Sequence, residues 1–165
     1  MLSKYISYFI KKFLPNRYAK SIGVLIGENC RLLGCEYGSE PYLIKIGNHV
    51  SATKVRFETH DGGIWVGRDK FPEIDRVQPI TIGDNVFIGY GAIILPGITI
   101  GNNVVIGACS VVTRNLESGY VYAGVPAKRI KSVDEYIENA VKNGDPTKSM
   151  NPGQKKSYYM NKYFN

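Results

Sequence analysis

The sequence predicts an all-β fold in which the chain winds into a parallel β-helix, and three observations support this prediction. From Ile82 onward, six consecutive six-residue blocks each begin with Ile or Val: IGDNVF, IGYGAI, ILPGIT, IGNNVV, IGACSV and VTRNLE. A helix repeats every 3.6 residues and a flat strand every 2, whereas repeats of six are typical of a parallel β-helix. The fifth place of each block is mostly small or aliphatic, and Gly, Asn and Pro-Gly stand within the blocks at the places expected for corners.

Each repeated position has a physical role in such a coil. The block-initial residue is expected to point inward and stack on its equivalent in the next coil, and the fifth residue is expected to face the same narrow interior. Asn85 and Asn103 tolerate the positive φ that a sharp corner requires, and Pro96-Gly97 is a turn dipeptide in a corner position. Three blocks make one triangular coil, so residues 82–117 predict about two coils.

Weaker copies of the repeat lie upstream, at residues 26–31 and 46–57, and the segment between them is irregular. The period is lost between Phe57 and Ile80. This gap contains ETHDGG, so His60 is placed where an inserted loop, residues 58–79, leaves the coil. The simplest interpretation of the gap alone is an ordinary inserted loop.

The N-terminal segment, residues 1–20, predicts an amphipathic helix. Lysines lie opposite an apolar face, and Pro15 ends the run; the face comprises Leu2, Tyr5, Ile6, Phe9, Ile10 and Phe13. Two interpretations remain open. The helix would cap the first coil and cover its strand edge, or it would attach to an anionic membrane surface.

The C-terminal segment, residues 132–165, predicts one helix followed by a basic, aromatic tail. Ser132 and Glu135 form a capping box, and Gly144 is a suitable stop. The tail is either loose or packs on a neighbouring subunit through late aromatic residues, which are Tyr158, Tyr159, Tyr163 and Phe164.

Composition limits the class of protein. The chain has 165 residues, of which 44% are hydrophobic, enough for one globular domain. Its net charge of +7 comes from the two ends, because residues 21–140 carry a net charge of −2. A nucleic-acid-binding face is not normally split in this way, so no nucleic-acid partner is expected.

The cysteine count and the N-terminus predict the compartment. The three cysteines, Cys30, Cys35 and Cys109, form no metal-type pair, and an odd number of them without a signal sequence indicates reduced thiols. We expect no membrane-spanning helix and no secretory signal. The expected location is therefore the cytoplasm, either free or peripheral at the inner face of the membrane.

With these residues in view, the chain resembles the hexapeptide-repeat acyltransferases, in particular the sugar and xenobiotic O-acetyltransferase branch. The resemblance rests on residues 79–131, from PITIGDN to GVPAKRIK, and on THDGG one loop earlier. It implies a left-handed β-helix for residues 21–131 and a homotrimer with active sites between neighbouring subunits. It also implies acetyl-CoA as the donor, transferring acetyl directly to a bound acceptor.

The resemblance also assigns a catalytic residue. An acceptor hydroxyl or amine must lose a proton as it attacks the thioester, and an imidazole, with an ordinary pKa of about 6.5, suits this task near neutral pH. His60 is the matching residue. A backbone carbonyl or an acidic group must hold its second ring nitrogen; Glu58 and Asp61 are nearby in the sequence, and the sequence does not choose among these partners. His49 occupies a corner position and is interpreted as a corner or surface residue.

Further contacts are implied by the resemblance. Pantetheine contacts fall on Tyr90, Ala108 and Thr113. The positions implied to bind the nucleotide phosphates are the cations Arg114, Lys128 and Lys131, which can form charge-assisted hydrogen bonds with phosphate. Phe87 stands where the family often has Trp, so it keeps an apolar wall without the indole N–H. Trp65, in the loop beside His60, would either stack on a sugar ring or anchor the loop.

Other classes of protein share the β-helix fold. A zinc enzyme of the γ-carbonic-anhydrase type shares the fold but needs three histidines, and this chain has two; no metal is expected. A non-catalytic β-helix scaffold would lack the histidine and the CoA-type motif, which are both present. N-acetylation of an amino-sugar nucleotide remains an alternative to O-acetylation of a sugar or polysaccharide precursor, which is the preferred interpretation.

Overall fold

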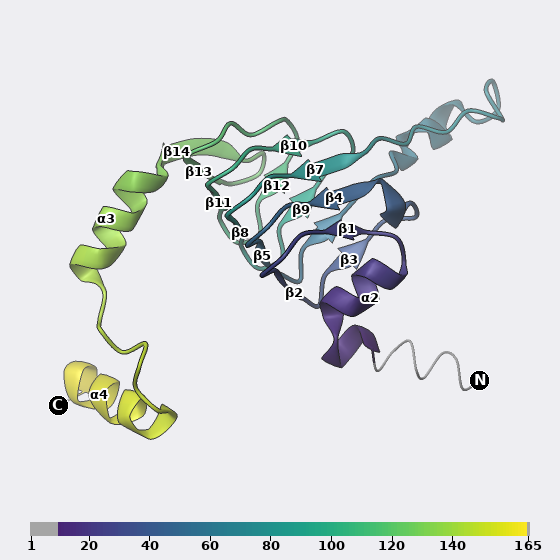
Figure 1. Cartoon of the computed structure of the whole chain (residues 1–165). Helices are drawn as coiled ribbons and strands as arrows, with labels where there is room; N and C mark the ends of the chain where they lie inside the picture. The colour runs from purple at the N-terminus through teal and green to yellow at the C-terminus, as the bar shows by residue number, and fades with distance from the viewer. Residues whose placement is uncertain (1–9, 165) are drawn as a thin grey trace. The chain divides into compact units, whose positions relative to one another are not determined.

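The computed structural model describes residues 10–164, which fall into two compact units. The first unit ends at Val133 and the second starts at Asp134. Figure 1 shows short strands stacked on one another in the first unit and two helices, α3 and α4, toward the C-terminus. In the described part of the chain, no helix combines the length and apolar character needed to cross a membrane.

The strands of the first unit wind through four coils, with three strands in each. Coil 1 contains β1 (Leu25–Ile26), β2 (Arg31–Leu33) and β3 (Glu36–Tyr37), and coil 2 contains β4 (Ile44–Ile46), β5 (Ser51–Thr53) and β6 (Arg56–Phe57). Coil 3 contains β7 (Ile80–Ile82), β8 (Val86–Ile88) and β9 (Ile93–Ile94), and coil 4 contains β10 (Thr99–Ile100), β11 (Val104–Ile106) and β12 (Val111–Val112).

Equivalent strands of successive coils pair in three sheets. Sheet A has the order β1-β4-β7-β10, sheet C has the order β3-β6-β9-β12, and sheet B runs from β2 through β5, β8 and β11 to β13 (Tyr120–Ala123) and β14 (Lys128–Ser132). Within these three sheets the strands pair in parallel, except β13 with β14. The predicted parallel β-helix is therefore confirmed.

The core is built from the repeated positions. Ile82 pairs with Ile100, Ile88 with Ile106 and Ile94 with Val112, and each of these side chains is at most 2% exposed. The fifth-place residues are buried as well, from Val86 to Leu116. Both inward-facing predictions are confirmed, because apolar ladders remove the most apolar surface from water when they stack along a narrow interior.

The corners depend on residues that tolerate left-handed backbone. Asn85 and Asn103 have φ of 55° and 54°, as predicted. Their side chains also hydrogen bond to each other at 2.8 Å. His49 has φ of 54° and its Nδ1 lies 2.8 Å from Oδ1 of Asn85. The interpretation of His49 as a corner residue is thus confirmed.

An excursion between β6 and β7 interrupts the coil without disturbing its register. Ile46 pairs with Ile82 across the insertion. Two backbone hydrogen bonds close the base of the excursion, from Gln78 N to Thr59 O at 2.9 Å and from Asp61 N to Arg76 O at 2.8 Å. The excursion contains the 3-10 helix η2 (Gly62–Gly67) and projects away from the stacked strands (Figure 1).

The open end of the β-helix is covered by α2 (Pro15–Ser21). Asn16 acts as a substitute for a missing strand, because its side-chain amide donates to Cys30 O and its Oδ1 accepts from Leu32 N at 3.1 Å. Ala19 is fully buried in the core. Most of the helix predicted over residues 2–14 lies outside the described residues. Its described part is helical over residues 10–13.

The second unit has two helices where the sequence predicts one helix and a tail. α3 (Val133–Asn143) follows Ser132 and ends before Gly144. α4 (Pro152–Phe164) spans the aromatic tail. It begins with a reciprocal capping box, in which Asn151 N donates to Gln154 Oε1 at 3.0 Å and Gln154 N donates to Asn151 Oδ1 at 2.9 Å. That local signal explains why the tail becomes helical.

Candidate active site

His60 lies at the base of the excursion, at the corner between sheets C and A. It directly follows the segment that leaves β6, and it forms an isolated antiparallel bridge with Val77 on the returning segment. Backbone hydrogen bonds on either side of this bridge hold both segments together. The imidazole is therefore carried by a closed backbone stem rather than by a free loop.

Glu40 holds one ring nitrogen of His60. Its Oε1 lies 3.3 Å from His60 Nδ1, and its Oε2 accepts a 2.9 Å hydrogen bond from the hydroxyl of Thr59. The Glu40 side chain is 15% exposed and the His60 side chain 28%, while Thr59 is fully buried. Glu40 precedes the 3-10 helix η1 (Pro41–Leu43) in coil 1. A carboxylate in this place favours the tautomer with its proton on Nδ1, which leaves Nε2 as a proton acceptor.

The opposite ring nitrogen is oriented toward the excursion. His60 Nε2 lies 3.9 Å from Oδ1 of Asp75, beyond hydrogen-bonding distance. Asp75 instead accepts a 2.9 Å hydrogen bond from Arg68, and this bond is the main cause that lowers the pKa of the Asp75 carboxyl below its ordinary value. Asp75 is thereby kept as a carboxylate paired with Arg68.

A pocket of about 300 Å³ opens beside His60. Leu95 and Pro96 of coil 3 and Thr113 of coil 4 form part of its lining. Three successive coils therefore contribute to one hollow at the corner between sheets C and A. Of the predicted donor contacts, Thr113 lines the same pocket as His60.

The two acidic neighbours of His60 in the sequence also line this pocket, but each has another partner. Glu58 pairs with Arg56. Asp61 accepts from Gly63 N at 3.0 Å and pairs with Arg76 at 3.2 Å. Both carboxylates are thus held at the pocket wall by other partners. Neither Glu58 nor Asp61, the candidates nearby in the sequence, holds the imidazole, because its partner is Glu40.

The two predicted aromatic contacts lie apart from one another. Trp65 is on η2 in the excursion and is 76% exposed. Phe87 is on β8, where it pairs with Ser51 and Val105 in sheet B and remains 47% exposed. Within one chain, Phe87 is therefore on a different sheet from the strands that end at the pocket.

Tyr90 and Ala108 lie at the other end of sheet C. Tyr90 precedes β9 and Ala108 precedes β12, whereas the pocket residues follow these strands. The two coils approach closely here, because a Cβ built on Gly89 would lie 2.5 Å from Ala108 N. Tyr90 is exposed, and its ring lies under Lys54 Nζ at 5.3 Å. The predicted pantetheine contacts thus occupy both ends of sheet C.

The predicted phosphate-binding cations also lie apart from one another, near the pocket and on sheet B. Arg114 is exposed directly after Thr113, near the His60 pocket. Lys128 and Lys131 are on β14, opposite Ala123 and Val121 of β13. The neighbouring Arg129 is engaged with the ring of Tyr120, 4.6 Å from its centroid.

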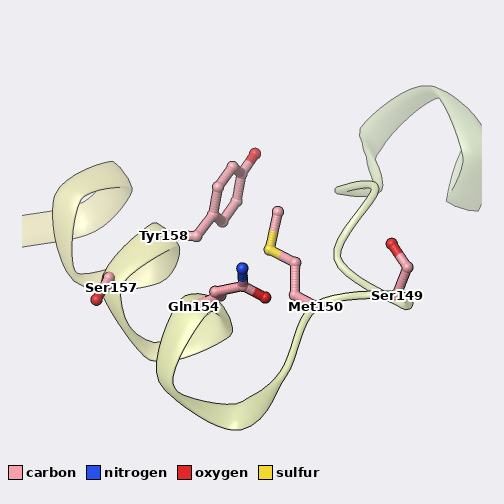
Figure 2. A pocket seen from close by; sticks show the side chains of 5 residues that line it. All are labelled: Ser149, Met150, Gln154, Ser157 and Tyr158. Carbon is pink, nitrogen blue, oxygen red and sulfur yellow. The ribbon is translucent and has the colours of Figure 1, made fainter.

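A second open pocket, of about 700 Å³, belongs to the second unit. Figure 2 shows its lining side chains, which are Ser149, Met150, Gln154, Ser157 and Tyr158. The hydroxyl of Tyr158 donates to Asp145 at 2.8 Å, and this bond raises the pKa of Tyr158. The lining of this pocket contains no histidine and no carboxylate, unlike the lining of the pocket at His60.

Comparison with known proteins assigns the family. Residues 79–114 match the model "Bacterial transferase hexapeptide (six repeats)". The chain is 48% identical to Protein CapG of Staphylococcus aureus, over 98% of this chain and 96% of that protein. It is also 31% identical to the crystal structure of a maltose O-acetyltransferase from Clostridium difficile, with a TM-score of 0.51, over 71% of this chain and 73% of that one. The chain belongs to the hexapeptide-repeat acetyltransferases.

This hexapeptide-repeat acetyltransferase has the left-handed β-helix of its family. The polySia-specific acetyltransferase NeuO is a further structural relative, with 29% identity and a TM-score of 0.57 over 67% of this chain and 52% of that one. Among the residues that the structure describes, no cluster of three or more His, Cys, Asp or Glu side chains is arranged to hold a metal ion.

The sequence contains a signal for Glu40 in the spacing of the coils. Coils 1 and 2 pair with an offset of 20 residues, as in Tyr37 with Phe57. Glu40 and His60 are separated by the same 20 residues. An alignment of the irregular segment with coil 2 would have placed this carboxylate beside the imidazole.

Proposed function

We propose that this acetyltransferase transfers the acetyl group of acetyl-CoA to a hydroxyl of a sugar or polysaccharide precursor, with His60 as general base. The observation that carries the proposal is the Glu40–His60 pair at the wall of the pocket. Family membership supports acetyl transfer, and the maltose- and polySia-directed relatives support a carbohydrate acceptor.

The reaction uses the two ring nitrogens differently. His60 Nε2 accepts the acceptor's hydroxyl proton as the oxygen attacks the thioester carbon. The tetrahedral intermediate collapses, the carbon–sulfur bond breaks, and the CoA thiolate receives the proton from the imidazolium. Glu40 keeps Nδ1 protonated and stabilises the imidazolium while it exists. A backbone N–H in the 88–92 region is proposed to stabilise the developing oxyanion.

The donor and acceptor contacts complete the proposal. Tyr90, Ala108 and Thr113 would contact pantetheine, and Arg114, Lys128 and Lys131 would bind the nucleotide phosphates. Glu58, Asp61, Trp65 and Phe87 would face the acceptor. Glu58 and Asp61 already line the His60 pocket, which supports their part in the site.

A homotrimer is part of this proposal. Tyr90 and Ala108 lie at one end of sheet C and the His60 pocket at the other, so one chain does not unite them. In a trimer, the Tyr90 end of one subunit would face the His60 end of its neighbour and complete the site. The free cysteines Cys30, Cys35 and Cys109 support a reducing compartment, and we propose the cytoplasm.

The test is an acceptor screen with radiolabelled acetyl-CoA, offering sugars, amino-sugar nucleotides and lipid-linked oligosaccharides. Esters are released by mild alkali and amides are retained, so product lability separates O- from N-acetylation. His60→Ala is expected to lower kcat by at least about 10²-fold, with the oligomeric state preserved. His49→Ala is the matched control, because His49 is a corner residue bonded to Asn85. Near-normal turnover of His60→Ala would refute the general base, and alkali-stable product would refute O-acetylation.

A further inference from the structure

The end of the β-helix that is capped by α2 carries exposed apolar side chains. α2 itself covers the core through Ala19 and Asn16. Phe13 and Leu14, just before it, remain 58% and 44% exposed. They line a pocket of about 380 Å³ together with Leu33 of the edge strand β2. Large apolar side chains grouped at one surface indicate a binding function.

Exposed cations belong to the same segments as these apolar side chains, and Lys12 Nζ lies 5.4 Å from the centroid of the Phe13 ring. Lys11, Lys12, Arg17 and Lys20 are exposed in the described helical segments, and Arg17 also lines the pocket. Arg31, a further lining residue, is oriented by hydrogen bonds to Ser51 Oγ at 3.1 and 3.3 Å. Glu28 is the single acidic residue among residues 1–35 of the sequence. The surface therefore combines exposed apolar side chains with a nearly uniform positive charge.

We propose that this surface, formed by residues 10–20 and the edge strand β2, binds the face of an anionic lipid bilayer. The lysines and arginines would contact headgroup phosphates, and Phe13 and Leu14 would enter the boundary between headgroups and acyl chains. This combination of basic and apolar residues is the one used by interfacial helices. The site is separate from the His60 pocket and does not depend on the proposed reaction.

Charge decides between a bilayer and a second copy of the chain as the occupant. In a symmetric dimer the same surface would meet itself, so Lys11, Lys12 and Arg17 of each copy would face like charges. An anionic bilayer offers the complementary charge together with an apolar interior. A lipid surface is therefore the occupant that satisfies both features.

The test is co-sedimentation of the full chain with vesicles of phosphatidylcholine alone or with 30% phosphatidylglycerol. We expect binding to the anionic vesicles, weakened by salt, and little binding to the neutral ones. Lys11→Gln/Lys12→Gln and Phe13→Ser/Leu14→Ser should each reduce the partition coefficient at least about tenfold. Lys155→Gln/Lys156→Gln is the charge-matched control in α4 and should change it less than about twofold.

Each contrary result overturns the proposal. An equal loss of partition coefficient in the α4 control would show that binding depends only on overall charge. Equal binding to both vesicle types would show that the surface does not recognise anionic headgroups. Circular dichroism and thermal melting verify that the variants fold. A changed oligomeric state of Phe13→Ser/Leu14→Ser by analytical ultracentrifugation would identify the surface as a subunit interface instead.

Discussion

Glu40 and His60 occupy equivalent places in successive coils. They are 20 residues apart, and Oε1 of Glu40 lies 3.3 Å from Nδ1 of His60. The same offset relates Glu36 to Arg56 and Tyr37 to Phe57 in the paired strands β3 and β6. Stacking of the coils, rather than proximity along the chain, therefore supplies the carboxylate that orients the proposed base.

Replacing Glu40 tests this orienting role. Glu40→Ala is expected to lower kcat about 10²-fold, the scale of loss that a misplaced catalytic group produces, with little change in KM for acetyl-CoA. Glu40→Gln keeps an oxygen acceptor and should lose less. Steady-state kinetics give both constants, and thermal melting reports folding.

Glu36→Ala is the matched control, because Glu36 is an exposed carboxylate of the same coil paired with Arg56 at 3.4 Å. It should retain wild-type kcat. If Glu40→Ala instead raised KM and lowered the melting temperature with kcat unchanged, Glu40 would be a structural residue only.

The cations of β14 are expected to bind the donor. Lys128→Ala/Lys131→Ala should raise the Kd for acetyl-CoA about tenfold or more, since a charge-assisted hydrogen bond contributes more than a neutral one. Isothermal titration calorimetry measures the change, and Lys155→Ala/Lys156→Ala in α4 is the control. An unchanged Kd in the β14 variant would move the phosphate site elsewhere.

Gly89 is expected to be required for the stacking of coils 3 and 4. A Cβ at this position would lie 2.5 Å from Ala108 N and 2.7 Å from Gly107 C, both backbone atoms. Gly89→Ala should therefore lower the free energy of unfolding by about 1–3 kcal/mol or more. Gly62→Ala is the control, because nothing lies within 4 Å of a Cβ there. Urea unfolding of both variants compares them, and equal stability would contradict the close packing.

Cys35 is expected to make stability fall at high pH. Burial raises the pKa of its thiol to about 11, and the side chain is 3% exposed. The unfolded chain ionises this thiol near its ordinary pKa of about 8.5, so above that pH the unfolded state binds fewer protons than the folded state. Its contribution is complete below about pH 8.5 and is lost as pH rises toward 11.

The measurement is the free energy of unfolding from urea titrations at several pH values between 7.5 and 11. Tyrosines and lysines also titrate in this range, so the wild-type slope is compared with that of Cys35→Ala. We expect the wild type to lose stability more steeply. Parallel curves would show that Cys35 ionises equally in both states.

Most of the β-helix was predictable because its information is local and repeated. Ile82, Ile88 and Ile94 mark the inward-facing positions of the three strands of one coil. The period of six predicts them without information on distant contacts. The corner Asn residues were predictable for the same reason, since positive φ is a property of a single residue. The helix α4 differs from the predicted tail because its signal is not a hydrophobic repeat but a single reciprocal cap at Asn151 and Gln154.

The sequence by itself determined the repeat, the family resemblance and the choice of His60, because each depends on residue types at short, regular spacings. Tertiary structure decided which carboxylate meets the imidazole and which proposed donor residues share its pocket. Glu58 and Asp61 are close to His60 in the sequence, yet they pair with arginines, while Glu40 contacts His60 from another coil. The physical reason is that coils stacked along the axis of the β-helix bring together residues one full coil apart. The first coil is irregular, so the six-residue repeat does not predict its length.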